Sequence, residues 1–193
     1  MSKVQIITTP NPLLRESAQK ATPGPETDAI IARMVEASLE WEKSHPHELS
    51  AAMAAPQIGE PYRIIILRDD LEDKENDSFT ALLNPEVIRE EGPLKTDYEG
   101  CLSVADGIYG LVPRYTKIKV KAFLADGQEV RVKVAGPLAR TILHEVDHLN
   151  GILFIDRIKG KKDAFFRLND QGELDPLDYD KEIAGNKTLF PDE

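Results

Sequence analysis

The sequence has little of what would place a protein in a membrane, on nucleic acid or in an oxidising compartment. Its 193 residues include one cysteine, Cys101, so an intramolecular disulfide bond is excluded. No stretch approaches the roughly 18 consecutive apolar residues that a membrane span requires, and residues 1–7 turn polar too soon for a signal peptide. The net charge of −10 argues against direct DNA binding and against anionic membranes, because both need a positive field. We therefore expect a cytoplasmic protein with no membrane or DNA contacts.

The composition that remains is that of a soluble globular protein. Hydrophobic residues make up 41% of the chain and charged residues 30%. A chain of this length fits one domain with a substantial core. We expect a single domain over residues 1–193, in which residues 163–193 form an acidic, proline-containing and partly irregular tail.

Several segments have the pattern of β-strands. The largely β-branched run at residues 64–67 predicts a buried strand. Residues 79–88 predict a second strand, interrupted near its proline. Residues 117–124 and 130–134 alternate between apolar and charged side chains on either side of the turn sequence Asp126-Gly127. That alternation predicts an antiparallel hairpin with a charged, solvated outer face.

Two segments have helical periodicity instead. Apolar residues recur mostly three and four positions apart over residues 30–39, which predicts an amphipathic helix. A second helix is expected over residues 138–150, after Gly136-Pro137 and before Gly151, because proline suits a first helical turn and glycine a helix end. Strands in runs with helices set apart indicate an α+β fold rather than alternating α/β.

The second helix carries a metal-binding pattern, His144-Glu145-Val146-Asp147-His148. Residues four apart share one helix face, with Cβ atoms roughly 5–6 Å apart, so both imidazoles can reach one ion while Glu145 acts as general base. The pattern alone also occurs by chance on solvated helices. Apolar flanks favour the metal site, since buried polar groups need partners. The remaining histidines, His45 and His47, lie in a polar loop without a helical ligand pair and are not assigned to the metal.

The third ligand of a catalytic site must come from elsewhere in the chain. No histidine follows His148, and most downstream acidic residues lie in turn-rich sequence. The single cysteine, Cys101, follows Gly100, which would allow close backbone approach. A thiolate and two imidazoles suit a divalent transition metal. Taken alone, Cys101 would be read as a buried inert thiol.

These motifs together resemble those of peptide deformylases. The family carries Ala-Ala-x-Gln, then Glu-Gly-Cys-Leu-Ser, then His-Glu-x-Asp-His, in that order. This chain has residues 54–57, 99–103 and 144–148 at these places, and the resemblance extends over about residues 5–158. Three ordered motifs are far more specific than one. The resemblance implies antiparallel sheets packed around a central helix that carries the metal motif.

The resemblance also implies a cofactor and a reaction. The metal ligands would be Cys101, His144 and His148, holding one divalent ion, natively Fe(II), with Zn, Ni or Co able to replace it. The enzyme would remove the N-formyl group from the initiator methionine of nascent peptides and release formate. A metal-bound water would attack, and Glu145 would act as base and then acid. The side-chain amide of Gln57 and the backbone N–H of Leu102 would form the oxyanion hole.

The substrate wall is where this chain departs from the family pattern. The family has Gly-x-Gly-Leu before Ala-Ala, whereas this chain has Ser50, Ala52 and Met53 at the two glycine positions and the leucine position. An added methyl at Ala52 could narrow the cleft and change substrate preference. By resemblance the wall of the substrate pocket also includes Glu99, and the helix residues Arg140 and Thr141.

Two alternative functions remain open, and the expected partners can be named. The first alternative is a deformylase-like metalloprotein with altered or lost formyl-methionine activity, acting on another N-acyl substrate. The second is a zinc endopeptidase that uses the same helix, which the intact cysteine motif disfavours. N-formylmethionyl peptides are the expected partners. One class of the family docks on the ribosome through a basic C-terminal helix, and the acidic residues 163–193 do not favour even a transient association by that route.

Overall fold

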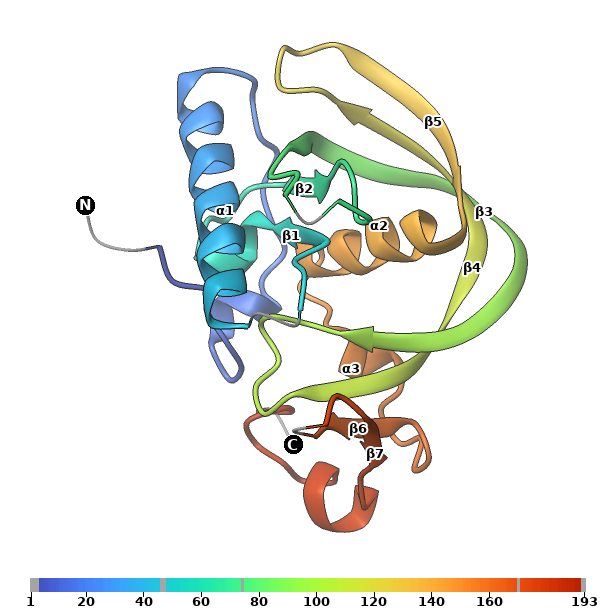
Figure 1. The fold of residues 1–193 in the computed structure, drawn as a ribbon. Helices are drawn as coiled ribbons and strands as arrows, with labels where there is room; N and C mark the ends of the chain where they lie inside the picture. The colour runs from blue at the N-terminus through green and yellow to red at the C-terminus, as the bar shows by residue number, and fades with distance from the viewer. Residues whose placement is uncertain (1–3, 46–47, 74, 170, 192–193) are drawn as a thin grey trace.

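The computed structural model describes residues 4–45, 48–73, 75–169 and 171–191 (Figure 1). It contains three α-helices, α1 (Pro25–Ser44), α2 (Gly136–Leu149) and the single-turn α3 (Phe154–Arg157). The strands are β1 (Ala52–Ala54), β2 (Ile64–Arg68), β3 (Phe79–Gly100), β4 (Ile108–Phe123), β5 (Glu129–Ala135), β6 (Phe165–Leu168) and β7 (Leu174–Pro176). Short 3-10 turns, η1 (Pro12–Arg15) and η2 (Ala55–Ile58), and a π-helical turn, η3 (Tyr179–Ile183), complete the described elements. The expected α+β class is confirmed. Within the described residues no helix is both long and apolar enough to cross a bilayer.

The strands form one antiparallel sheet in the order β1-β2-β3-β4-β6-β7, and β5 also pairs with β4. Both β5 and β6 pair with β4. The first residues of β4 pair with β6, and its last residues pair with β5. The predicted hairpin is confirmed, with Val120 opposite Val132. The long β3–β4 ribbon curves around α2 (Figure 1).

The structure corrects the expected interruption of the strand over residues 79–88. That segment was expected to break near Pro85, but the strand continues to Gly100. A register shift between Leu83 and Glu86 replaces the break, and two further shifts follow along β3. Register shifts bend a strand and increase its twist without ending it. The bent ribbon therefore carries the residues around Cys101 back to the face of α2.

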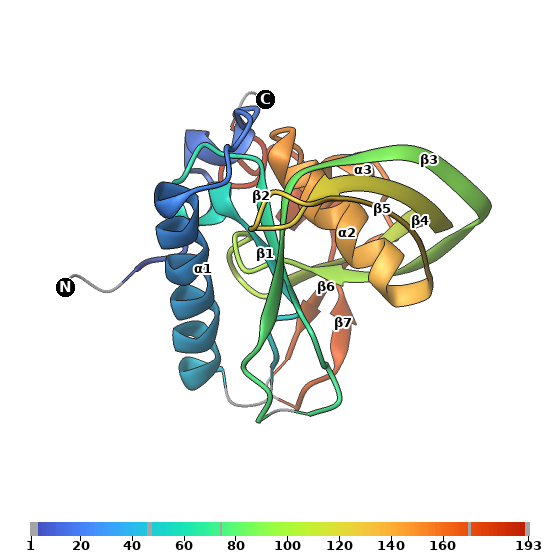
Figure 2. The same ribbon diagram turned by 90° about the horizontal axis from the view of Figure 1, so that it is seen from above.

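The core lies on both faces of β1 and β2. One cluster joins α2 to this part of the sheet and includes Ile65, Ile142 and Leu149. A second cluster joins α1 to the opposite face and includes Met34 and Ile66. Figure 2 shows α1 and α2 on either side of these strands. A strand covered on both faces needs an unbroken apolar sequence, which explains the run in β2.

A third cluster is built largely by the acidic C-terminal segment. Between short regular pieces, β6, β7 and η3, this segment buries Phe165, Ile183 and Phe190 against α3 and the start of β4. The backbone carbonyl of Leu189 also accepts a hydrogen bond of 2.8 Å from Arg15, at the other end of the chain. The segment is therefore attached to the rest of the molecule by apolar burial and by a polar contact.

Candidate metal centre and substrate cavity

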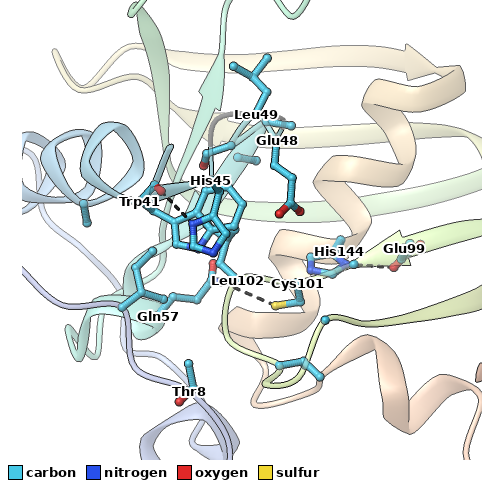
Figure 3. A pocket seen from close by; sticks show the side chains of 18 of the residues that line it. Thr8, Trp41, His45, Glu48, Leu49, Gln57, Glu99, Cys101, Leu102 and His144 are labelled. Carbon is cyan, nitrogen blue, oxygen red and sulfur yellow. Dashed lines mark hydrogen bonds and ion pairs between the residues drawn. The ribbon is translucent and has the colours of Figure 1, made fainter. Parts of the chain in front are cut away.

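Three side chains with metal-binding atoms converge where β3 ends against α2. The Sγ of Cys101 lies 3.2 Å from Nε2 of His148. One ligand atom from each of Cys101, His144 and His148 lies within 4.8 Å of the other two. Figure 3 shows Cys101 facing His144, with Glu99 behind the imidazole. The sulfur and the two nitrogens are thus close enough to share one ion.

Both histidines lie on α2, and the ends of this helix are well defined. Pro137 lies in its first turn, and Gly151 follows its last residues with a φ of 71°. A Cβ at Gly151 would lie 2.4 Å from the carbonyl oxygen of Arg15, so only glycine fits the helix end. One helical turn separates His144 from His148, and their ring centroids are 5.1 Å apart.

Cys101 is held by the turn that follows β3. Its thiol accepts a hydrogen bond of 3.4 Å from the backbone N–H of Ser103, and its carbonyl accepts one of 3.1 Å from Val104. The glycine before it is required by packing, since a Cβ at Gly100 would lie 2.5 Å from the ring of Tyr109. The sulfur is partly exposed and can be reached from the cavity.

A buried carboxylate fixes the orientation of His144. Oε2 of Glu99 lies 2.9 Å from Nδ1 of His144, which leaves Nε2 for a metal ion. Arg114 donates to both carboxylate oxygens at 2.9 and 2.8 Å, and Arg140 donates to one at 2.7 Å. Burial alone would raise the pKa of Glu99, but the hydrogen bonds from Arg114 and His144 hold it well below its usual range. Glu99 is therefore ionised at neutral pH.

The pKa values of the two histidines are shifted in opposite directions. Burial lowers the pKa of His148 well below its ordinary value, and the nearby His144 adds to this shift. Burial opposes the charged form of His144 too, but hydrogen bonds to Cys101 and Glu99 raise its pKa well above its ordinary value. The thiol and the carboxylate beside His144 therefore favour a positive charge at this place. Metal binding at such a site releases a proton.

Glu145 adds an acid–base group to the centre. Its side chain is buried, and Oε2 has no hydrogen-bond partner among the described residues. Burial raises its pKa to about 7, against the opposing charge of His144. A carboxyl group with a pKa near neutrality can both take and give a proton at neutral pH.

Gln57 directs its amide group at the same centre. Its Oε1 accepts a 2.8 Å hydrogen bond from the backbone N–H of Ala54, which fixes the amide orientation. The Nε2 group then donates to Ser103 Oγ at 3.2 Å and lies 3.7 Å from Cys101 Sγ. A buried N–H donor therefore points toward the ligand cluster from the side opposite α2.

A cavity of about 910 Å³ opens onto the cluster, lined by residues of α1, the segment before β1, the ends of β3 and β4, and α2. Its lining includes most of the residues expected from the sequence, namely Ser50, Ala52, Gln57, Glu99, Cys101, Leu102, Arg140, Thr141, His144 and Glu145. Met53 is not among the lining residues. Its side chain is fully buried in the cluster beneath α1.

The cavity lining also contains side chains that the sequence did not assign to the site. Tyr109 donates a 3.0 Å hydrogen bond to Glu48, and burial together with that carboxylate raises the tyrosine pKa to about 12. His45 lines the cavity and stacks on Trp41 with ring centroids 4.0 Å apart, whereas His47 lies outside the described residues. The role of Arg114 in a buried ion pair with Glu99 was also missed.

Comparison with known proteins identifies the family. A family model described as polypeptide deformylase matches residues 3–164. A peptide deformylase of Thermomicrobium roseum is 41% identical over 159 residues, which cover 81% of this chain and 86% of the relative. A peptide deformylase of Halothermothrix orenii is 40% identical over 159 residues, covering 82% and 95%.

Solved structures agree with this assignment. The peptide deformylase from Synechococcus elongatus in complex with actinonin has a TM-score of 0.70 at 33% identity, covering 81% of this chain and 80% of that one. A class I type b peptide deformylase from Acinetobacter baumannii, with Met-Ala-Ser bound, has a TM-score of 0.69 at 28% identity, covering 81% and 100%. The chain therefore belongs to the polypeptide deformylase family, a family of hydrolases.

Proposed function

We propose that this enzyme removes the N-formyl group from the initiator methionine of nascent peptides, releasing formate and a free amino terminus. The observation that carries the proposal is the convergence of Cys101, His144 and His148 beside Glu145, whose buried Oε2 has no hydrogen-bond partner among the described residues. Family membership supports the reaction, and the Met-Ala-Ser bound to the Acinetobacter baumannii relative is a peptide that begins with methionine. The whole chain would act as one catalytic domain.

The donor set fits a divalent transition metal. One thiolate and two imidazoles within 4.8 Å of one another leave an open position, as catalytic sites require. We take Fe(II) as the native ion and Zn, Ni or Co as possible replacements, with α2 as the helix that carries the metal motif. The bound ion would supply Lewis acidity that lowers the pKa of a water molecule and polarises the formyl oxygen.

The protein's own groups would complete the reaction. Glu145 would accept a proton from the attacking water and pass it to the nitrogen of methionine as the C–N bond breaks. The formyl oxygen gains negative charge in the tetrahedral state. The amide of Gln57 and the backbone N–H of Leu102 would donate hydrogen bonds to it, and one such donor is worth about 3–4 kcal/mol.

The methionine side chain would lie against the wall that contains Ser50, Ala52, Glu99, Arg140 and Thr141. Met53 would act only by supporting this wall from the core, because its side chain is buried there. Ser50 and Ala52 keep the alternative of another N-acyl substrate open, since both line the cavity. A zinc endopeptidase is less favoured, because the cysteine lies within the ligand cluster.

The test is formate release from formyl-Met-Ala-Ser by protein purified anaerobically with iron. Release that disappears in Glu145→Gln, while the bound metal stays at the wild-type level, would support the proposal. Glu36→Gln, an exposed position on α1, is the matched control and should keep full activity. Release of acetate from acetyl-Met-Ala-Ser, without release of formate from the formyl peptide, would replace the proposal with the alternative N-acyl substrate.

A further inference from the structure

Residues 48–51, which precede β1, form part of the cavity wall, and an ion pair between Glu42 and Arg68 holds Ser50 among them. Ser50 lines the cavity, and its backbone N–H donates a 2.8 Å hydrogen bond to Oε1 of Glu42. Its backbone carbonyl accepts a hydrogen bond of 3.2 Å from Nε of Arg68. Glu42 and Arg68 also bind each other through Oε1 and the guanidinium. One ion pair thus holds both polar groups of the Ser50 backbone.

The arginine of this ion pair is buried and makes further contacts. The Arg68 side chain has 0% exposure, and its guanidinium lies 4.8 Å from the ring centroid of Phe79. A second guanidinium nitrogen donates to the carbonyl of Asn76 and lies 3.7 Å from Asp77 Oδ1. A buried arginine is costly unless its donors are satisfied. The contacts therefore allow it little freedom, and so limit the freedom of the segment that it holds.

Further hydrogen bonds extend the restraint to the start of β1. The hydroxyl of Ser50 donates to that of Ser38 on α1 at 3.2 Å. The carbonyl of Ala51 accepts a 2.9 Å hydrogen bond from the backbone N–H of Arg68, and Ala52 pairs with Leu67. The cavity wall over residues 50–52 is thereby attached to α1 and to β2 at successive residues.

Neither charged residue lines the cavity itself, so any effect on the reaction passes through the cavity residues that the pair holds, Ser50 and Ala51. We propose that Glu42 and Arg68 are positioning residues that hold residues 50–52 in place for substrate binding. The proposal rests on the proposed function, because it concerns the peptide substrate of that site. It assigns the pair to substrate affinity rather than to the chemical step, since none of the contacts of the pair described above is with a metal ligand or with Glu145.

The test separates substrate binding from folding. Glu42→Ala removes the acceptor and the charge, whereas Glu42→Gln keeps an acceptor oxygen for Ser50 and removes only the charge. We expect KM for formyl-Met-Ala-Ser to rise about tenfold in Glu42→Ala and less in Glu42→Gln, with kcat and metal content unchanged. Glu60→Gln is the matched control, because it breaks the ion pair between Arg33 of α1 and the loop after η2, away from the cavity. An unchanged KM in Glu42→Ala, with only a lower Tm, would overturn the proposal.

A second measurement keeps the inference separate from the reaction. Absence of formate release by the wild-type enzyme would concern the proposed function alone. Amide hydrogen exchange over residues 49–54 then decides the positioning role. Faster exchange there in Glu42→Ala, with no change in Glu60→Gln, is the expected result. Equal exchange in wild type and Glu42→Ala would show that the pair does not hold the segment.

Discussion

Two groups of ion pairs in this enzyme use the same chemistry with different consequences. In the group beneath the metal centre, Arg114 lies between Glu99 and Asp147, and these three side chains are 3–5% exposed. In the group on the outer face of the β4–β5 hairpin, Glu129 lies between Lys121 and Arg131, and these are 32–64% exposed. The nitrogen–oxygen distances in the second group, 3.2 and 3.0 Å, are those of ordinary ion pairs.

The two groups differ in whether water can solvate a charge that has lost its partner. On the hairpin, water solvates each charge once a pair is broken, so exposed pairs contribute little. Beneath the metal centre, a charge that loses its partner stays buried, which is strongly unfavourable. The buried group also joins the β3–β4 ribbon to α2, whereas the exposed group joins only β4 and β5, which backbone hydrogen bonds already hold. Burial therefore makes the first group a determinant of both stability and site geometry.

The largest expected effect is that of Arg114→Met. This change leaves Glu99 and Asp147 without their shared partner, and breaking a buried pair costs about 3–5 kcal/mol. The free energy of unfolding, measured by urea denaturation, should fall by that amount. Arg131→Met, the matched change on the hairpin, should leave the free energy of unfolding within experimental scatter. Equal losses in the two variants would contradict the comparison.

A smaller effect is expected when the carboxylate behind His144 loses its charge. Glu99→Gln keeps an acceptor for the imidazole but weakens its orientation and basicity. Loss of such a partner typically lowers metal affinity about 10–100-fold. Metal affinity measured by competition with a chelator should show this loss. Asp97→Asn, an exposed position two residues earlier on β3, should bind metal like the wild type, and a matching loss there would rule out a specific role for Glu99.

Local patterns in the sequence predicted the elements whose causes are local. The hairpin follows from alternation around one turn, and α2 from a proline at its start and a glycine at its end. The approach of Cys101 to His144 and His148 followed from the chemistry of the motifs together with the family resemblance. The length of β3 did not follow, because the strand continues through register shifts in its pairing with β4 that no local pattern marks.

The buried network could not be predicted, because its members lie far apart in the chain. Glu99 is 15 residues from Arg114 and 45 from His144, and no periodicity links such positions.

The packing of the C-terminal segment could not be predicted from the sequence either. Its acidic composition indicates solvent exposure, yet Phe165, Ile183 and Phe190 are buried by a core that only the folded chain provides. Composition describes the average of a segment, whereas burial is decided residue by residue.

The smallest expected effect is that of Glu129→Gln on the hairpin. This carboxylate pairs with Lys121 and Arg131, and these hydrogen bonds lower its pKa, but its exposure lets water compensate when the charge is removed. Calorimetry should find a Tm that matches the wild type, both at low ionic strength and in high salt. A clear loss of Tm that high salt abolishes would mean that these charges stabilise the hairpin despite their exposure. Burial would then not be what separates the two groups, and the number of shared partners would be the better explanation.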